Sequence, residues 1–472
     1  PMGNRSVAAE SKGREAIVSI SPLRKPLWHG EEDHSPIARL LMVNDERRLR
    51  RFTKITMPPL LVLAHRLPYP PNRGDKIRSF HLLRWLSQRF DVYLGTFFDD
   101  PNDEQYIDAL RPFVKEIKAI PLSLTLFNKI KKTGSAFLTG SPITLACFHS
   151  PEMQLWVHNV CRQQKIGSGL AICSSMAPYL MADGLNLRHR VIDFIDLDSD
   201  KWRQYQSQFP WPMSALYKRE HERLFAFERE VARHFDHHFF VSQLELQLFN
   251  RQTSGAFKEK GTAIANGIEG DYYQPQDEQC NEPSAKLHQE LSQRRYLVFT
   301  GTMNATANIE SVEWFLNAIW PSLKLEFSDL ELYVVGNNPT ARVQSWSKLD
   351  SVTVTGGVPD VRPYLQHSRI AIAPMLLARG VQNKVLEAMA MAKPVAMTER
   401  AAEGLTFPAA QQKLVAFNAK QMIESVAYLL TNPEEADNIG SHNRQLVLEK
   451  YSWSKQLNGL TTIMSGELHV RH

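Results

Sequence analysis

Short apolar segments alternate with amphipathic helical segments along most of this chain, and this alternation limits its fold more than any other feature. Parallel strands joined by crossover helices produce such a pattern, because each buried strand is a short apolar run and the return to the next strand needs a helix. The sequence therefore predicts an α/β protein. The predicted strands are 60–65, 92–97, 170–174, 191–195, 238–242 and 262–266 in the N-terminal half, and 297–301, 332–336, 352–356, 370–374 and 395–398 in the C-terminal half.

The predicted strands fall into two groups, and 472 residues are too many for one ordinary core, so we expect two Rossmann-like domains. The N-terminal domain is expected over residues 57–275 and the C-terminal domain over residues 295–450. Residues 276–294 are polar and show no strand pattern, which places the linker there. Residues 451–472 are expected to form a helix that crosses back to the N-terminal domain. A ligand site should lie where the two domains face each other across a cleft, at the carboxyl ends of the strands.

Charge is concentrated at the N-terminus. Residues 1–56 contain 11 Lys and Arg against 7 Asp and Glu, whereas the remaining residues contain 44 against 43. The folded part is therefore nearly neutral, which argues against nucleic-acid binding. Residues 1–56 also lack hydrophobic periodicity and the pattern of a secretion signal, so we expect a disordered extension ahead of a start at Met57.

Two further features bear on where the protein works. No apolar run approaches the ~18 residues that a membrane-spanning helix needs, which predicts a soluble or peripheral protein. The cysteines do not have the paired spacing of a zinc site, so we interpret them as small buried residues in a reducing cytosol. A cytoplasmic location is therefore expected. The cysteines are Cys147, Cys161, Cys173 and Cys280.

The segment from Arg379 to Pro394 is the most informative part of the C-terminal half. It follows a predicted strand and has apolar residues at helical spacing, so we expect a helix whose first N–H groups can bind a diphosphate. Lys384 can add a positive charge, and Glu387 can accept hydrogen bonds from a ribose diol. The alternative is an ordinary amphipathic helix with solvated polar residues.

As a unit, this segment resembles the donor-site helix of the retaining glycosyltransferases of family four. Residues 266–275 resemble the hinge-proximal signature of that family, and residues 451–453 resemble its terminal crossing helix. Residues 66–81 and 196–203 are similar to the subgroup of sugar transferases associated with PEP-CTERM/exosortase exopolysaccharide systems. The resemblance extends from Met57 to the C-terminus and implies a GT-B fold. The residues that carry the donor-helix likeness are Gly380, Asn383, Lys384, Glu387, Ala388, Lys393 and Pro394.

The resemblance implies a donor that is a nucleotide sugar of the UDP or GDP type. One position departs from the family, because Arg379 stands where a glutamate usually contacts the donor sugar, eight residues before Glu387. The identity of the sugar therefore cannot be carried over, and a guanidinium there could bind the pyrophosphate or an acidic sugar. The loop 304–306 also lacks the family's basic residue, which leaves phosphate neutralisation to Lys384, Arg379 or Arg362. The expected donor contacts are Gly301, Arg362, Arg379, Gly380, Val381, Gln382, Asn383, Lys384 and Glu387.

On the N-terminal side, a Pro-rich loop leads from Arg66 to Gly74, where a predicted helix begins. In the family this loop borders the acceptor and the donor phosphate, so Arg66, Gly74, Asp75 and Arg78 are expected to contact the acceptor. Asp75, Arg78 and His81 recur at intervals of three and share one helix face. A solvated polar stripe is the alternative for that face.

Aspartates follow the strand 191–195. Asp193 and Asp196 are candidates to contact the acceptor hydroxyl or sugar, and with Lys384 they are the predicted catalytic residues. Asp196 and Asp198, with Asp200, could instead bind a divalent cation. A GT-B enzyme replaces the cation with helix dipoles and basic residues, so we expect neither a metal nor a cofactor.

Three histidines, His234, His237 and His238, could also suggest a metal site. They lie around the start of a predicted strand, where adjacent side chains point to opposite faces. We therefore interpret them as structural residues.

The resemblance implies transfer with retention by a front-face mechanism, in which the departing phosphate takes the acceptor proton and no enzymic nucleophile is needed. The protein would then act by orienting the substrates and stabilising the leaving diphosphate. A GT-B nucleotide-sugar epimerase and a non-catalytic nucleotide-sugar-binding scaffold are the alternatives.

The acceptor is expected to be a glycan or a lipid-linked molecule. Residues 127–132 combine lysines with apolar residues, and residues 205–217 add Phe209, Trp211, Pro212 and Met213. Such segments suit peripheral contact with anionic headgroups at the inner face of the cell membrane. Packing of these segments against the domain's own core is the alternative.

Overall fold

The computed structural model describes residues 57–71, 73–122, 133–134, 136–275, 282–378 and 381–464. The expected N-terminal extension, residues 1–56, lies outside this range. So do Cys280, Arg379, Gly380 and the segment 127–132.

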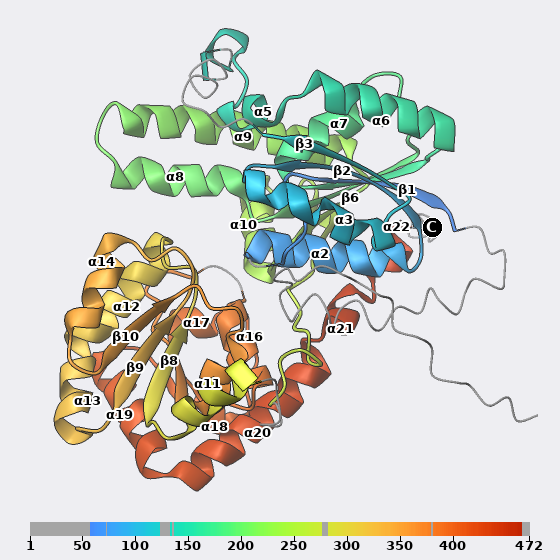
Figure 1. Cartoon of the computed structure of the whole chain (residues 1–472). Helices are drawn as coiled ribbons and strands as arrows, with labels where there is room; N and C mark the ends of the chain where they lie inside the picture. Colours follow the sequence, from blue (N-terminus) through green and yellow to red (C-terminus); the bar gives the residue numbers. More distant parts are fainter. Residues whose placement is uncertain are drawn as a thin grey trace, which may run out of the picture. The chain divides into compact units, whose positions relative to one another are not determined.

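Thirteen strands are described, and they form two sheets (Figure 1). The strands are β1 (Pro59–Ala64), β2 (Asp91–Phe98), β3 (Glu116–Pro121), β4 (Ser168–Ile172), β5 (His189–Ile195), β6 (His237–Phe240), β7 (Gly261–Ala263), β8 (Tyr296–Thr300), β9 (Glu331–Val335), β10 (Val352–Gly356), β11 (Ile370–Ala373), β12 (Val395–Thr398) and β13 (Val415–Ala416).

Each sheet has the doubly wound topology of a Rossmann fold. The N-terminal sheet runs in the order β3-β2-β1-β4-β5-β6-β7, and the C-terminal sheet runs in the order β10-β9-β8-β11-β12-β13. Neighbouring strands pair in parallel. The strand order reverses between β1 and β4 in one sheet and between β8 and β11 in the other, and ligands bind beside such reversals. The predicted fold of two α/β domains is confirmed.

Two strands were not predicted, and both lie at sheet edges. β3 has one buried residue, Ile120, so it contains no apolar run that a sequence pattern would reveal. β13 has only two residues.

Helices connect the strands in both sheets. They are α2 (Gly74–Ser87), α3 (Ile107–Leu110), α5 (Ile143–Phe148), α6 (Pro151–Gln164), α7 (Ala177–Met181), α8 (Asp198–Gln208), α9 (Met213–His234), α10 (Gln243–Gln252), α11 (Glu282–Ser292), α12 (Thr306–Ala318), α13 (Trp320–Glu326), α14 (Ala341–Gln344), α15 (Arg362–His367), α16 (Asn383–Ala390), α17 (Glu399–Ala402), α18 (Ala409–Gln412), α19 (Ala419–Thr431), α20 (Pro433–Lys450), α21 (Trp453–Leu457) and α22 (Leu460–Met464). Among the helices so described, none is both long and apolar enough to cross a bilayer.

The N-terminal sheet is buried on both faces. Leu60 and Val62 of β1 belong to a core shared with α2 and α22, whereas Leu61 and Leu63 belong to a second core with α6, α7 and α9. In Figure 1, α2 lies on one face of this sheet and α6 and α7 lie on the other. Successive strand side chains point to opposite faces, so a strand covered on both sides reads as a continuous apolar run.

The expected linker contains a helix, α11, which belongs with the C-terminal domain. Leu291 is buried in the core of that domain. His288 Nδ1 lies 2.9 Å from Nε2 of His367 on α15. The polar composition of this stretch concealed the helix, because only one of its faces is buried.

The chain changes domains again near its end. Tyr451 packs in the C-terminal core, whereas Trp453 packs in the core that contains α2. The Ile268 N–H donates to the Tyr451 carbonyl oxygen at 2.7 Å, and Ile268 forms a bridge with Ser452. A Cβ at Gly267 would lie 2.6 Å from the Trp453 Cα, so only glycine fits beside this crossing.

Candidate functional site

The predicted donor helix is present as α16, which begins at Asn383. Lys384 in its first turn contacts the sulfur of Met375, which follows β11. A Cβ added at Gly301, which follows β8, would lie 3.2 Å from Lys384 Nζ. The start of α16 therefore lies at the carboxyl ends of β8 and β11, where the strand order reverses and a ligand is expected.

Lys384 is held by uncharged groups. Its Nζ donates to Asn308 Oδ1 at 2.6 Å and lies 4.2 Å from the centre of the Phe299 ring. Burial lowers the pKa of Lys384 to about 7, although the charge of Glu387 acts to raise it. Because no carboxylate among the described residues pairs with its Nζ, Lys384 can pair with an anionic ligand.

Glu387 lies one turn beyond Lys384 on the same helix and faces the hinge-proximal segment. It is hydrogen-bonded to the side chain of Tyr273. Burial raises the pKa of Glu387, against the opposing effects of that hydrogen bond and of Lys384. The Tyr273 carbonyl oxygen accepts from Arg444 Nη1 at 2.7 Å, so the tyrosine is fixed on both sides.

Other predicted donor residues are placed less favourably for binding. Val381 is buried and a Cβ at Gly404 would lie 3.7 Å from it, so Val381 is a packing residue. Gln382 precedes the first helical residue, and its carbonyl oxygen accepts from the Val385 N–H at 3.0 Å. Asn383 Oδ1 accepts from Asn266 Nδ2 at 3.4 Å.

Arg362, a predicted donor contact, is paired with an aspartate in this structure. It is buried, and its Nε and Nη2 donate to Asp360 at 2.9 and 2.6 Å. Its Nη1 donates to the Tyr272 carbonyl oxygen at 3.1 Å, and its guanidinium lies over the Tyr272 ring. The charge is therefore neutralised by Asp360, and Arg362 anchors the hinge-proximal segment to the C-terminal domain.

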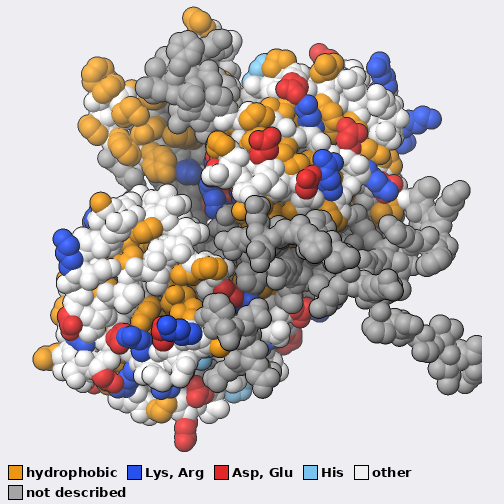
Figure 2. Space-filling view, viewed as in Figure 1, with side chains coloured by type: hydrophobic (Ala, Val, Ile, Leu, Met, Phe, Trp, Pro, Cys, Tyr) orange, Lys and Arg blue, Asp and Glu red, His pale blue; other side chains and the backbone are white. Residues whose placement is uncertain are grey.

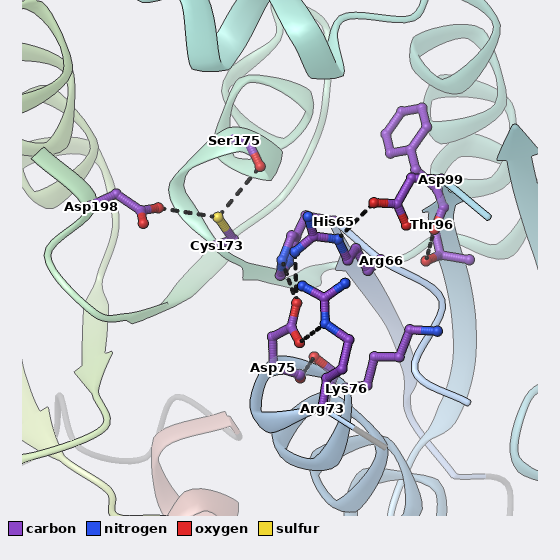
Figure 3. A network of polar contacts seen from close by, with 12 residues as sticks. His65, Arg66, Arg73, Asp75, Lys76, Thr96, Asp99, Cys173, Ser175 and Asp198 are labelled. Carbon is purple, nitrogen blue, oxygen red and sulfur yellow. Dashed lines mark hydrogen bonds and ion pairs between the residues drawn. The ribbon is translucent and has the colours of Figure 1, made fainter. Parts of the chain in front are cut away.

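A second polar network lies at the carboxyl ends of β1 and β2 (Figure 3). Arg66 donates to Asp75 at 2.8 Å and to Asp99 at 3.3 Å. Burial would raise the pKa of Asp75, but His65, Arg73 and Arg66 outweigh burial and hold that pKa well below its usual range. Asp75 is thus an ionised anchor at the start of α2.

Gly74, also predicted at this place, is exposed. No atom lies within 4 Å of where its Cβ would be. Gly74 is exposed and Arg66 and Asp75 are partly exposed, so a ligand could reach these three predicted acceptor residues.

Arg78 and Asp193 are corrections to the predicted site, because they bind each other in the interior. Arg78 Nε donates to Asp193 Oδ2 at 2.6 Å, and Arg78 Nη2 donates to Asp193 Oδ1 at 3.1 Å. Their side chains are 1% and 0% exposed. Arg78 Nη1 also donates to the Ile264 carbonyl oxygen and to Asn266. This pair ties α2 to β5 and to the hinge-proximal segment, and neither group is open to an acceptor.

His81 completes the predicted stripe, and the stripe is not solvated. The His81 ring stacks on Trp453 with ring centres 4.4 Å apart, and its Nδ1 lies 3.7 Å from Glu269. Burial lowers the pKa of His81 to about 3. On the helix face that carries Asp75, Arg78 and His81, the last two are buried and Asp75 is partly exposed.

The aspartates after β5 lie in three different environments. Asp196 is exposed, as its predicted role requires. Asp200 is buried and accepts from Arg203 and Gln204 at 2.6 and 3.1 Å. Asp198 lies 3.5 Å from Cys173 Sγ (Figure 3). In the part of the chain that the structure describes, no three His, Cys, Asp or Glu side chains are grouped as a metal site would need.

Cys173, which follows β4, is a neutral thiol. Burial is the main cause that raises its pKa to about 12. A thiolate is the nucleophilic form of cysteine, so this group is not set up as a nucleophile.

The three histidines around β6 are dispersed. His237 Nε2 lies 2.8 Å from Thr262 Oγ1, and His234 Nδ1 lies 2.9 Å from the Glu230 carbonyl oxygen. His238 is buried, with its ring centre 5.4 Å from that of Phe249. These contacts agree with the structural interpretation.

Asn308 and Tyr273 are site residues that the sequence did not indicate. Tyr273 lies in the recognised segment 266–275, but nothing in that segment shows that its side chain reaches Glu387. Asn308 follows the loop 304–306, and its contact with Lys384 spans 76 residues of sequence.

Comparison with known proteins adds to this geometry. Residues 294–432, which contain all six strands of the C-terminal sheet, match the family model "Glycosyl transferases group 1". No curated protein matches the chain.

Solved structures share the fold over both domains. HepE from Anabaena in complex with UDP is 12% identical, with a TM-score of 0.60, and the match covers 87% of this chain and 100% of that one. Sucrose-phosphate synthase from Thermosynechococcus elongatus is 15% identical, with a TM-score of 0.63 and coverage of 88% and 100%. WaaG, a glycosyltransferase involved in lipopolysaccharide biosynthesis, is 16% identical, with a TM-score of 0.55 and coverage of 86% and 100%.

The fold is GT-B, with two Rossmann-like domains. At these identities the structural likeness establishes the fold, and the family model matches the C-terminal domain. Together they support a GT-B glycosyltransferase.

Proposed function

We propose that this protein transfers a sugar from a nucleotide sugar to a glycan or lipid-linked acceptor, with retention at the anomeric carbon, in exopolysaccharide biosynthesis. The observation that carries the proposal is the position of Lys384. Its amine lies at the strand reversal of the C-terminal sheet, beside Gly301 and at the start of α16, with uncharged partners. This is where a diphosphate would find a cation and free helix N–H groups.

The donor side of the proposal has two parts. Lys384 and the first N–H groups of α16 bind the diphosphate, and Glu387 accepts hydrogen bonds from the ribose. Arg379, four residues before the helix, is proposed to contact the pyrophosphate or an acidic sugar. HepE has been solved with UDP and with UDP-glucose, so uridine nucleotides are the first donors to test, followed by GDP sugars.

The acceptor side uses the carboxyl edge of the N-terminal sheet. Arg66 and Gly74 border it at the end of β1, and Asp196 borders it at the end of β5. Asp196 is the remaining candidate for a contact with the acceptor hydroxyl, since Asp193 is paired with Arg78. An exposed carboxylate there can orient the hydroxyl by accepting its hydrogen bond.

The chemistry proposed needs no metal and no covalent enzyme intermediate. The departing phosphate takes the acceptor proton, while Lys384 and the helix N-terminus stabilise the negative charge that develops on the diphosphate. The protein therefore contributes position and electrostatics.

Peripheral membrane contact is part of the proposal. Three apolar residues are exposed where α8 leads into α9. Phe209 and Trp211 lie between the two helices, Met213 is the first residue of α9, and Trp211 is 81% exposed. Figure 2 shows hydrophobic side chains gathered over the connected ends of α8 and α9. Exposed aromatic residues suit the interface of a membrane that carries a lipid-linked acceptor.

The function is tested by turnover with UDP-, GDP- and CMP-sugars, each with and without lipid-linked acceptors. We expect release of nucleoside diphosphate that depends on an acceptor, with a product whose anomeric configuration is that of the donor. Donor conversion without acceptor would instead indicate an epimerase, and binding without turnover would indicate a scaffold.

A further inference from the structure

Lys384 has no carboxylate partner at its Nζ among the described residues. Its nearest groups are the Asn308 amide oxygen at 2.6 Å, the Met375 sulfur at 3.5 Å and the Phe299 ring at 4.2 Å. None of these groups carries a charge. They can stabilise an ammonium, but they cannot neutralise it.

Asn308 is itself fixed. Its Nδ2 donates to the Thr302 carbonyl oxygen at 2.9 Å, so its Oδ1 is the atom left to face Lys384. A Cβ at Gly301 would lie 2.8 Å from that Nδ2, so any larger residue at position 301 would displace the amide. Asn308 therefore offers one acceptor at a set place.

Few of the described residues place a charge near Lys384. From its own helix, α16, Glu387 acts on it electrostatically. Tyr273 from the hinge-proximal segment is bonded to Glu387 and stays neutral, because burial raises its pKa well above the ordinary value. The groups that face Lys384 from β8, from α12 and from the segment after β11 are the uncharged Phe299, Asn308 and Met375.

We propose that Lys384 takes up a proton when the donor diphosphate binds, and that Asn308 is the positioning residue that holds the resulting ammonium against the phosphates. The inference rests on the proposed donor site. The proton comes from the solvent, adds to the lone pair of the amine, and returns to the solvent when the nucleoside diphosphate leaves.

Proton uptake is expected because donor binding changes the electrostatic environment of the Lys384 amine. In the empty site, burial lowers the pKa of Lys384 to about 7, so near neutral pH the amine is partly uncharged. Two negative charges at contact distance favour the ammonium and raise that pKa again. Donor binding should then weaken as the pH rises above 7, by up to about tenfold per unit.

Calorimetry of nucleotide-sugar binding tests the inference. UDP-glucose and GDP-mannose are the probes, because their diphosphates do not titrate near neutral pH. Each titration is run in two buffers with different ionisation enthalpies, so that the difference in heat gives the protons taken up. We expect about half a proton at pH 7 and nearly one at pH 8.

Two variants separate the role of Asn308 from general effects. Asn308→Asp places a carboxylate against Lys384, which keeps the amine charged in the empty site, so uptake at pH 8 should fall close to zero. Asn317→Asp is the matched control, since Asn317 is exposed on the same helix about 13 Å further along, and its uptake should equal that of the wild type. Thermal unfolding of both variants checks that they fold.

The outcomes are distinct. Binding without proton uptake at pH 8, or equal uptake by wild type and Asn308→Asp, would overturn this inference and leave the proposed function in place. Failure of wild type to bind either probe, or any sugar of the turnover panel, would overturn the proposed function and this inference together.

Discussion

Charged residues in a recognised motif divide into those that a substrate can reach and those that hold the motif in shape. Arg78 of the segment 66–81 and the predicted donor residue Arg362 are each bound to an aspartate. Lys384 occupies a similar motif position but has uncharged partners. The sequence shows that these charged residues are present, but it does not show which residue from a distant part of the chain pairs with each of them. Asp193 lies 115 residues from Arg78.

We expect Glu387 to be needed for donor binding. A carboxylate that accepts hydrogen bonds from a ribose diol contributes about 1.5 to 3 kcal/mol, so Glu387→Gln and Glu387→Ala should weaken donor affinity by roughly ten- to 150-fold. The fold should remain intact. Calorimetry with the preferred nucleotide sugar measures the change, and Glu424→Gln on the exposed side of α19 is the control. Unchanged affinity in the Glu387 variants would refute the assignment.

Arg78 should matter for stability rather than for the acceptor. Arg78→Met leaves Asp193 buried without its ion-pair partner, and breaking a buried pair costs about 3 to 5 kcal/mol. Urea unfolding should show this loss, and the double variant Arg78→Met/Asp193→Leu should recover part of it. If Arg78→Met is as stable as the wild type and has a raised KM for the acceptor, Arg78 contacts the acceptor as the sequence predicted.

At the scale of elements, the sequence pattern predicted every interior strand of the two sheets and two of the four edge strands, β7 and β10. Eleven predicted strands correspond to strands of the two sheets, because apolar runs are required wherever helices cover both faces. β3 and β13 were not predicted, because β3 is only partly buried and β13 has only two residues. The helix α11 was not predicted because its sequence is mostly polar.

The connected ends of α8 and α9 carry a prediction of their own. Aromatic rings pack beneath the exposed tip, with the Trp202 and Tyr217 ring centres 5.5 Å apart, so the tip is supported. We expect Trp211→Ser to reduce binding to anionic vesicles at low salt, because an exposed indole gains free energy at the lipid interface. Replacing Lys129, Lys131 and Lys132 by Ser should weaken vesicle binding further. Added salt should weaken the binding of the wild type in the same way, because it screens the charges of these lysines.

Vesicle sedimentation measures this binding. Leu325→Ser is the control, since Leu325 is 90% exposed but belongs to the C-terminal domain. If wild type fails to sediment with anionic vesicles, or if Trp211→Ser and Leu325→Ser behave alike, the membrane role should be abandoned in favour of a soluble acceptor.

At the scale of the whole molecule, two Rossmann-like domains are joined at two places. The segment 266–275 leaves the N-terminal sheet, and the chain returns to the N-terminal domain near Ser452. The two crossing segments are hydrogen-bonded to each other through Ile268 and Tyr451. Gly267 is required at that contact by the approach of Trp453. The resemblance identified both segments, but their pairing could only be seen once the fold was known.

Catalysis should not depend on a divalent cation. The diphosphate is proposed to be held by Lys384 and the start of α16, and Asp200 already has Arg203 and Gln204 as partners. We therefore expect turnover to continue in EDTA at the rate measured without it. Complete loss in chelator, with recovery on adding Mn²⁺ or Mg²⁺, would favour a metal bound through Asp196 and Asp198.

The most direct test of the account is a crystal structure of the protein with its preferred nucleotide sugar. We predict the diphosphate against Lys384 Nζ and the first N–H groups of α16, and the ribose hydroxyls against the Glu387 carboxylate. A nucleotide found elsewhere, for instance in the cavity of about 350 Å³ that Arg84, Glu269 and Trp453 line, with Lys384 and Glu387 unoccupied, would contradict the central claim.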